Sequence, residues 1–413
     1  MRCLNTTTFE IREADQAWFK HHGYAILSHR WQQSEVLFDQ ATRCANDLRR
    51  TTGRHANAGM DKILGACITA RQLSIEWMWI DSCCINKTYS AELLEALNSM
   101  FNWYKDAVVC ITFLGDVISR GPTSASPDSP AVFHDERTGK PSVWFTRGWT
   151  LQELLAPTKM YFYDANWRFF GSRTQLAVAL ARITGIARPY LTGERHFRDA
   201  CIATKMSWMA GRTTTREEDM AYSMAGIFNV SLDAQYGEGR NAFMRLQRAL
   251  LAKNDESLFA WKMPVAGLPG DHDHRVPIPS VGLGPREWGL LAASPAWFAD
   301  CGRMTSRGGR GIIRPEGGLG LTPQGISGYI ARRDALVTKM FSSRTKSAST
   351  NLALNCWEED AAGNLKAVQV ALRPVSRNPA IFVRTECQAY DLVDGIKSTS
   401  ASAFGTVMQP ELY

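Results

Sequence analysis

The sequence predicts an α/β fold, in which a parallel sheet with helices on both faces precedes a helical segment and a smaller β-rich domain. Short apolar segments alternate with helical sequence before residue 115, and a mainly helical stretch follows from residue 172 to residue 253. Past Trp261, Gly, Pro and short alternating strands dominate the chain. These changes predict three regions, at residues 1–170, 171–262 and 263–413.

Three short apolar segments are predicted to be the first strands of the sheet, at Tyr24–Ser28, Glu76–Ile80 and Val108–Leu114. Strands that alternate with helices pair in parallel and are covered on both faces. We therefore expect the first two of these strands to lie next to each other.

The helix after the second strand has the clearest pattern in the chain. Its apolar stripe and its polar face lie on opposite sides at helical spacing, and Ser90 is its expected N-cap. The stripe consists of Leu93, Leu97, Met100 and Tyr104, and the polar face of Glu92, Glu95, Ser99 and Asn102.

The remaining elements follow from local composition. Gly121–Ser142 is rich in Pro, Ser and Gly and is expected to be an exposed loop. A helix at Arg147–Leu155 should stop before Pro157, and a strand should follow at Lys159–Tyr163. Further helical segments are expected at Gln175–Thr184, Ala200–Ala210, Glu217–Phe228 and Arg240–Lys253.

Composition favours a soluble protein of the cytoplasm. The 413 residues are 45% apolar and 21% charged, as in ordinary globular proteins. The net charge of +7 arises from 47 basic and 40 acidic residues spread along the chain, so neither a nucleic-acid nor a membrane partner is indicated. The ten cysteines include no CxxC pair, and the sequence contains neither a signal peptide nor an apolar run long enough to span a membrane.

Three dense blocks carry the strongest functional signal. They are Tyr24–Trp31, Trp79–Lys87 and Phe145–Pro157. Together they resemble the signature blocks of the fungal heterokaryon-incompatibility (HET) domain. Further segments continue the resemblance over roughly the first 260 residues; these are Leu4–Glu13, Arg212–Tyr222, Tyr236–Gly239 and Ala242–Gln247.

The resemblance implies a fold and a role. HET domains are similar in fold to TIR domains, so it implies a TIR-like (flavodoxin-like) sheet. The role implied is that of an effector that triggers programmed cell death when copies associate after non-self recognition. Many TIR domains cleave the nicotinamide–ribose bond of NAD, which makes NAD the expected substrate, and no resident cofactor is expected. Partners implied are a second copy, other HET proteins or a nucleotide-binding oligomerisation receptor, although this sequence has no Walker motif.

Two of the blocks begin where predicted strands end. In an open α/β sheet, ligands bind beyond the carboxyl ends of the strands. Polar and aromatic side chains at these ends suit a ligand with phosphates, hydroxyls and a flat ring. The expected substrate-binding residues are Ser28, Arg30, Trp31, Asp81 and Asn86.

Glu92 is the expected catalytic residue, by the resemblance to TIR domains that use one glutamate on the helix after a central strand. A carboxylate there could stabilise the positive charge that develops on the ribose. The alternative is structural, because acidic residues are favoured in a first helical turn by the helix dipole alone.

The third block gives further expected substrate-binding residues, Arg147, Trp149 and Glu153. On a helix, Trp149 shares a face with Gln152 and Glu153. The alternative is that Arg147 forms an internal salt bridge with a carboxylate and Trp149 packs in the core.

Other residue clusters favour structure over chemistry. Cys83 and Cys84 are more typical of small core residues than of a nucleophile assisted by His29. Asp271–His274 has metal-ligand residue types but lies in a Gly/Pro-rich stretch typical of a solvated loop, so no metal is expected. Because no unambiguous catalytic set is present, two functions remain open: a NAD-cleaving effector and a non-enzymatic signalling adaptor.

Overall fold

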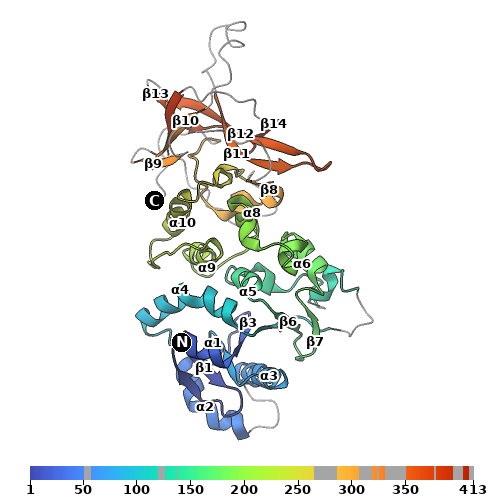
Figure 1. Cartoon of the computed structure of the whole chain (residues 1–413). Helices are drawn as coiled ribbons and strands as arrows, with labels where there is room; N and C mark the ends of the chain where they lie inside the picture. The colour runs from blue at the N-terminus through green and yellow to red at the C-terminus, as the bar shows by residue number, and fades with distance from the viewer. Residues whose placement is uncertain are drawn as a thin grey trace. The chain divides into compact units, whose positions relative to one another are not determined.

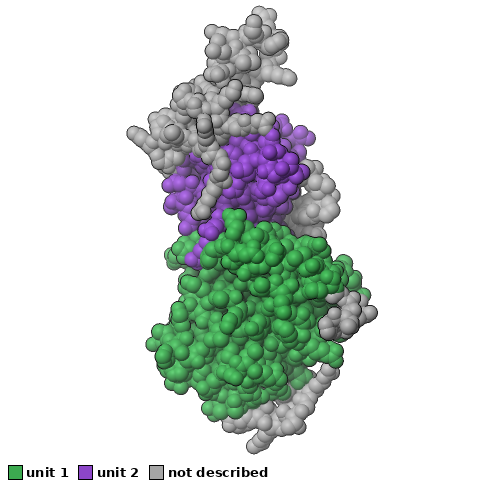
Figure 2. All heavy atoms as spheres, turned by 45° about the vertical axis from the view of Figure 1, so that its right-hand side comes forward, with its two compact units in different colours: residues 1–197, 212–235 green, residues 198–211, 236–413 purple. Residues whose placement is uncertain are grey.

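The computed structural model describes residues 1–50, 57–119, 126–135, 137–264, 286–306, 319–322, 325–330, 350–375, 378–393 and 403–408. The chain forms two compact units (Figure 2). Unit 1 consists of residues 1–197 and 212–235, and unit 2 of residues 198–211 and 236–413. The helical stretch expected at 171–262 is therefore divided between the two units.

Unit 1 is built on a seven-stranded sheet of order β2-β1-β4-β3-β5-β6-β7 (Figure 1). Its strands are β1 (Arg2–Asn5), β2 (Ile11–Glu13), β3 (Tyr24–His29), β4 (Trp77–Trp79), β5 (Val109–Phe113), β6 (Met160–Tyr163) and β7 (Phe169–Ser172). The four central strands are parallel, and β3 lies between β4 and β5, which confirms the expected neighbours. The sheet is mixed, however, because β1, β2 and β7 add antiparallel edges.

Helices cover both faces of this sheet. Helix α3 packs on β4 and β5, and α5 packs on β3 (Figure 1). In Figure 1, α3 lies on one side of the sheet, whereas α4 and α5 lie on the other. The helices of unit 1 are α1 (Gln16–His22), α2 (Phe38–Arg50), α3 (Ala58–Gln72), α4 (Ser90–Asp106), α5 (Thr150–Leu155), α6 (Ala177–Thr184), α7 (Arg188–Thr192) and α9 (Asp219–Phe228), with 3-10 turns η1 (Pro130–Phe133) and η2 (Val143–Thr146).

Two helix starts differ from the expectation. The N-cap of α4 is Tyr89, so Ser90 is the first helical residue rather than the cap. Helix α5 begins at Thr150 instead of Arg147, because Arg147 ends the preceding 3-10 turn with an extended backbone (φ −86°, ψ 136°). The stripe on α4 is confirmed at Met100 and Tyr104, which are both buried.

The segment expected to be an exposed loop is attached to the core. Phe133 is fully buried, and its ring packs edge-on against Phe145, Phe162 and Phe170. Serine and proline made the segment look solvent-exposed, but a single aromatic ring can remove roughly 150–250 Å² from water and anchor a loop. The loop prediction is therefore wrong at this residue.

Unit 2 contains the β-rich part of the chain, as expected. The sheet of unit 2 has the order β8-β11-β12-β13-β15-β10-β9, with β14 paired to β12 (Figure 1). The strands are β8 (Met304–Thr305), β9 (Gly320–Thr322), β10 (Gly325–Ile330), β11 (Thr350–Glu359), β12 (Leu365–Val375), β13 (Asn378–Arg384), β14 (Asp391–Val393) and β15 (Ala403–Met408). The helical elements are α8 (Ile202–Ser207), α10 (Asn241–Leu251), η4 (Glu256–Phe259), η5 (Pro295–Phe298) and η6 (Cys301–Arg303).

Unit 2 contains a fully buried arginine, Arg384. The guanidinium of Arg384 donates to the carbonyl oxygens of Phe259 at 2.9 Å and Trp261 at 2.6 Å. It also lies 3.8 Å from the centre of the Trp261 ring, where a cation is attracted to the ring face. These contacts join the end of β13 to the last residue of η4 and to the segment after it.

Candidate functional site

The carboxyl ends of the parallel strands bring the first and third sequence blocks together. Ser28 on β3 donates a hydrogen bond of 2.5 Å to the carboxyl group of Glu153 on α5. The indole nitrogen of Trp144 donates to the Ser28 hydroxyl oxygen at 2.9 Å. All three residues are buried, so this contact is part of the interior just beneath the sheet edge.

Burial has a clear effect on the ionisation of Glu153. Burial raises the pKa of Glu153, and the negative charge of Asp81 raises it further, to about 8, although Ser28, Tyr104 and Arg212 act in the opposite direction. A carboxyl group with this pKa is mostly protonated at neutral pH. Arg212 itself donates to the Thr150 hydroxyl at 2.8 Å, which holds its guanidinium beside α5.

The first and second blocks meet nearer the surface. The indole nitrogen of Trp31 donates to Asp81 Oδ2 at 2.7 Å, and the Trp31 side chain is among the exposed large hydrophobics, at 39%. The ammonium of Lys87 lies 3.4 Å from the centre of the Trp31 ring and 3.7 Å from Asp81 Oδ2. An aromatic face, a cation and a carboxylate therefore share this corner of unit 1.

Behind that corner, His29 lies between two acids. Its Nε2 atom is 3.6 Å from Glu35 Oε2 and 3.7 Å from Asp81 Oδ1, and Lys62 is paired with the other Glu35 oxygen. Burial alone would raise the pKa of Glu35, but attraction to His29 and Lys62 outweighs it and lowers the pKa to about 2. Glu35 is therefore ionised at neutral pH.

Glu92 makes a different set of contacts from those expected. Its carboxylate pairs with the guanidinium of Arg2 on β1 and accepts the backbone N–H of Asn86 at 2.8 Å. The Asn86 side chain in turn accepts from the backbone and hydroxyl of Thr88. Glu92 therefore joins the amino-terminal strand to the turn before α4, and its catalytic role stays a prediction.

The remaining expected site residues lie at different depths. Arg30 is exposed, Arg147 is half-buried, and Trp149 is half-buried at the start of α5. Arg147 donates to the Thr215 hydroxyl at 3.0 Å, so the contact seen is with a hydroxyl and not with the carboxylate of the salt-bridge alternative. Trp149 is only half-buried, so the alternative that placed its side chain in the core is wrong.

Comparison with known proteins found a family match and a relative. Residues 24–138, from β3 to the segment after β5, match the family described as heterokaryon incompatibility protein (HET). The vegetative incompatibility protein HET-E-1 of Podospora anserina is 39% identical to the chain over 239 residues. The matched segment, residues 24–138, is therefore a HET domain. The alignment covers 57% of this chain but only 16% of the length of HET-E-1. No solved structure was found to match the chain.

Several residues that build the site in this HET domain were missed by sequence reasoning. Trp144 stands one residue before the third block, and Tyr104 was counted only as part of an apolar stripe. Glu35 and Lys62 lacked a local motif, because they pair with each other across 27 residues of sequence. Lys87 ends the second block but was not chosen as a site residue. A buried tryptophan or tyrosine usually needs a hydrogen-bond partner, which is the one signal that could have identified the first two.

Metal binding finds no support in the described part of the chain. No group of three or more His, Cys, Asp or Glu side chains there could hold a metal ion. Asp271–His274 lies outside the described residues. Cys83 and Cys84 are both buried. The neighbouring Cys84 together with burial raises the pKa of Cys83 well above its usual value, which suits a core residue rather than a nucleophile. None of the described helices is long and apolar enough to cross a membrane.

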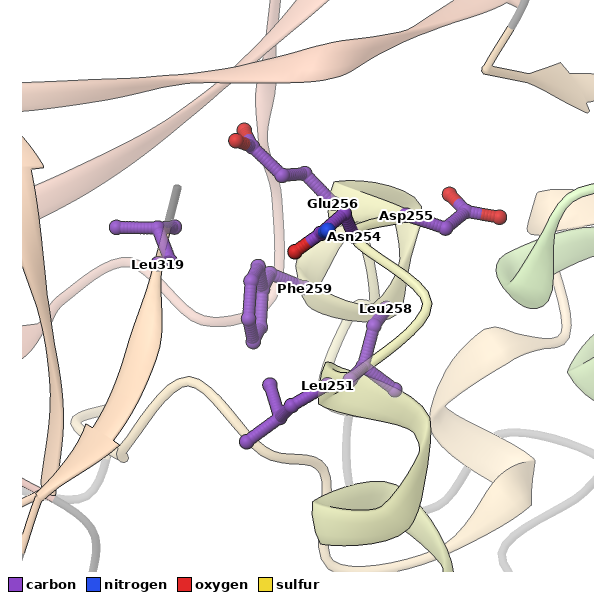
Figure 3. Close-up of a pocket in the computed structure, with 7 residues that line it drawn as sticks. All are labelled: Leu251, Asn254, Asp255, Glu256, Leu258, Phe259 and Leu319. Atoms are coloured by element: carbon purple, nitrogen blue, oxygen red, sulfur yellow. The ribbon is translucent and has the colours of Figure 1, made fainter. Parts of the chain in front are cut away.

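A hollow in unit 2 is too small for a nucleotide (Figure 3). Its volume is about 30 Å³, whereas pockets for organic ligands usually measure roughly 300–1,000 Å³. Apolar side chains and a short polar edge line it: Leu251, Asn254, Asp255, Glu256, Leu258, Phe259 and Leu319. Space of this size suits a water molecule or two.

Proposed function

We propose that this chain is an effector of heterokaryon (vegetative) incompatibility, which triggers programmed cell death in the cytoplasm when copies associate. The HET domain and the 39% identity to a vegetative incompatibility protein support this role. The partners proposed are further copies, other HET proteins or a nucleotide-binding oligomerisation receptor, because HET-E-1 is much longer than the aligned region. A nucleic-acid partner is not proposed.

We further propose that the effector acts by hydrolysing NAD. The observation that carries this proposal is the Ser28–Glu153 pair at the carboxyl end of β3. The parallel strands have the order second, first, third, fourth along the chain, which is the order of flavodoxin-like and hence TIR-like sheets. In such sheets ligands bind where strand order reverses, between the first and third strands, and Ser28 stands beside Thr112 at this point.

The chemistry needs a carboxyl group near the reacting ribose. Water adds to the anomeric carbon as the bond to nicotinamide breaks, which gives ADP-ribose, nicotinamide and one proton. A carboxylate can stabilise the positive charge on the ribose and accept the proton from water. Glu153, with its pKa of about 8, exchanges a proton near neutral pH, as efficient acid–base groups do. Glu92 is the rival carboxyl group predicted from the sequence.

The test is chromatographic. Purified, concentrated protein is incubated with NAD, and NAD, nicotinamide and ADP-ribose are quantified over time. We expect equimolar release of both products, and a loss of about 10²-fold or more in rate for Glu153→Gln. Glu95→Gln, an exposed change on α4, is the matched control. A folded Glu153→Gln variant with wild-type turnover would remove Glu153 from the reaction.

The second candidate is an adaptor that assembles with other HET or TIR-like proteins without catalysis. It is favoured by the surface of α4 and the turn before it, where Tyr89 is 62% and Leu94 36% exposed. Exposed apolar side chains in a group often mark protein contacts. Cell killing by a protein that releases no nicotinamide, and loss of killing in Tyr89→Ser, would favour the adaptor over the enzyme.

A further inference from the structure

The Ser28–Glu153 pair has almost no exposed surface. Ser28 is 0% and Glu153 7% exposed, and the buried indole of Trp144 bonds to the Ser28 hydroxyl. A dissolved substrate can therefore reach the pair only after a neighbouring segment moves. Segments that open locally at the least cost have few buried apolar contacts and are held mainly by polar contacts near the surface.

Residues 30–37, which we call the strap, have these properties. Val36 is 2% exposed and anchors the strap in the core, whereas Glu35 is held by charged groups. The other residues of the strap are exposed; they are Arg30, Trp31, Gln32, Gln33, Ser34 and Leu37. A single buried apolar side chain is a weak attachment, because hydrophobic stabilisation grows with the apolar area removed from water.

The strap crosses the carboxyl edge of the parallel sheet. It begins at the end of β3, and the indole nitrogen of Trp31 donates to Asp81 Oδ2 at 2.7 Å, just after β4. On the other side, the Nε2 atom of Gln32 lies 3.0 Å from the place that a Cβ on Gly115 would occupy, just after β5. The strap therefore reaches the ends of all three strands around Ser28.

Charged groups hold the strap in this position. The Glu35 carboxylate pairs with Lys62 on α3, and His29 Nε2 lies 3.6 Å from its other oxygen. The ammonium of Lys87 lies 3.4 Å from the centre of the Trp31 ring. These polar contacts are the ones that must break when the strap lifts.

The backbone of the strap also packs directly on the first turn of α3. A Cβ on Gly59 would lie 2.1 Å from the Ser34 carbonyl oxygen and 3.0 Å from the Val36 nitrogen. Glycine permits such a close approach of another backbone, whereas any side chain at this position must push the strap away. Gly59 therefore allows the strap to close.

We propose that the strap is a lid, which closes the Ser28–Glu153 site in this structure and lifts to admit the substrate. The inference rests on the proposed function and adds the control of access to the same site. Asp81 connects the two parts, because its Oδ2 atom holds Trp31 while its negative charge acts on Glu153. A lid of this kind shields the reacting groups from water until the substrate is bound.

The first test lifts the strap with Gly59→Ala and measures whether residue 28 becomes accessible. The proteins compared also carry Ser28→Cys, and alkylation of that thiol by iodoacetamide is followed by peptide mass spectrometry on the full chain, so that other cysteines do not interfere. We expect Gly59→Ala to accelerate labelling at least about tenfold, since overpacking shifts the neighbouring backbone. Gly211→Ala is the matched control, because a Cβ there meets no atom within 4 Å.

The second test releases the Trp31 side chain. Trp31→Ala removes the hydrogen bond to Asp81 and the contact with Lys87, so labelling of residue 28 should again accelerate at least about tenfold. Phe169→Ala is the matched control, because Phe169 is an exposed aromatic residue on β7, outside the strap.

A third measurement follows the strap itself. The Glu35 side chain is only 5% exposed, so a glutamate-specific protease can cut the bond between Glu35 and Val36 only when the strap has lifted. In proteins that retain Ser28, cleavage of this bond should accelerate in Gly59→Ala and Trp31→Ala by a factor similar to that of labelling.

Unchanged labelling in folded Gly59→Ala and Trp31→Ala proteins would overturn the inference. Faster labelling without faster cleavage would overturn it too, because another segment would then open the site. If Gly59→Ala fails to fold, Trp31→Ala decides alone, since its position is 39% exposed. NAD turnover of the proteins that retain Ser28 separates this result from the proposed function. Faster labelling and cleavage without turnover would keep the lid and reject hydrolysis, whereas turnover with unchanged labelling would reject the lid and keep the enzyme.

Discussion

Each unit contains a buried ionisable side chain, and the two are stabilised in opposite ways. Arg384 in unit 2 donates to two backbone carbonyl oxygens, and burial lowers its pKa only to about 10, so it stays charged at neutral pH. Glu153 in unit 1 is bound by side chains, and its pKa of about 8 leaves it mostly neutral. Backbone groups hold Arg384, whereas side chains hold Glu153, which can itself gain or lose a proton near neutral pH.

The difference separates a structural group from a candidate functional one. A cation held by the backbone of neighbouring segments stabilises one arrangement of the chain and has no chemistry to perform. An acid whose proton leaves near neutral pH, at the carboxyl end of a parallel strand, has the properties of a catalytic group. Variants that alter one group and not the other can test this distinction.

The largest expected effect is that Glu153 makes the free energy of unfolding depend on pH. Its folded pKa of about 8 exceeds the ordinary value of 4.5, so between these values the folded state binds more protons than the unfolded state. Stability should therefore fall as pH rises from about 4.5 to 8, by on the order of 4 kcal/mol. Glu153→Gln cannot titrate, so its stability relative to the wild type should increase with pH in urea unfolding at pH 5, 6, 7 and 8. Parallel curves for the two proteins would contradict the raised pKa.

Arg384→Met is expected to lower the free energy of unfolding by a smaller amount. The carbonyl groups of Phe259 and Trp261 would lose their donors, at a cost of about 3 kcal/mol, since each buried carbonyl left unpaired costs roughly 1–3 kcal/mol. The loss should not depend on pH between 5 and 8, unlike the effect of Glu153. Chemical unfolding followed by fluorescence measures it, with the partly exposed Arg373→Met as control. A change below about 0.5 kcal/mol, typical of surface positions, would show that Arg384 is dispensable.

The hydrogen bond from Trp144 to Ser28 can be isolated by a matched pair of variants. Trp144→Phe removes this bond and some volume, whereas Trp79→Phe removes the same volume from an indole whose nitrogen has no acceptor among the described residues. Both residues are fully buried. We expect Trp144→Phe to cost about 1 kcal/mol more than Trp79→Phe, which is the usual net value of a hydrogen bond. Equal losses of unfolding free energy would mean that the bond contributes nothing.

The sequence predicted the elements whose cause is local. Apolar strands and the stripe on α4 follow from hydrophobic periodicity, and the four expected helices of the 175–253 stretch are present with shorter bounds. The antiparallel edge strands were missed, because β1 and β2 are only four and three residues long and gain their stability from pairing with β4 and each other. Phe133 was missed for the same reason, since its partners come from other parts of the chain.

The site was predicted in part. Ser28, Trp31 and Asp81 were expected near one edge because strand ends converge there, and Trp31 does contact Asp81. Glu153 was expected from the third block, and its contact with Ser28 was not predicted. Two observations distinguish Glu153 from Glu92 as a candidate catalytic residue: Glu153 is buried with a raised pKa, and Glu92 is paired with Arg2. Arg2 is 90 residues from Glu92 in the sequence, so periodicity could not reveal that pair.

Glu92→Gln is expected to have the smallest effect on stability. It is also the most decisive change, because it tests whether Glu92 or Glu153 is the reacting carboxyl group. The Glu92 side chain is 21% exposed and binds Arg2 and the N–H of Asn86. Gln keeps an oxygen acceptor and loses the charge, so we expect a cost of about 1 kcal/mol, within the range of partly exposed ion pairs. Glu95→Gln, on the same helix and exposed, should cost less than about 0.5 kcal/mol.

Activity on the same Glu92→Gln protein then decides its role. Because the carboxylate is engaged by Arg2 and a backbone N–H, we expect NAD turnover and cell killing to stay within about threefold of the wild type, as for a residue that affects stability alone. Melting temperature, nicotinamide release and viability should be measured together. A loss of about 10²-fold in turnover at unchanged melting temperature would instead return the reaction to Glu92, since a charge that stabilises the transition state has that effect. Glu153 would then be a buried anchor like Arg384, and the contrast between the two units would disappear.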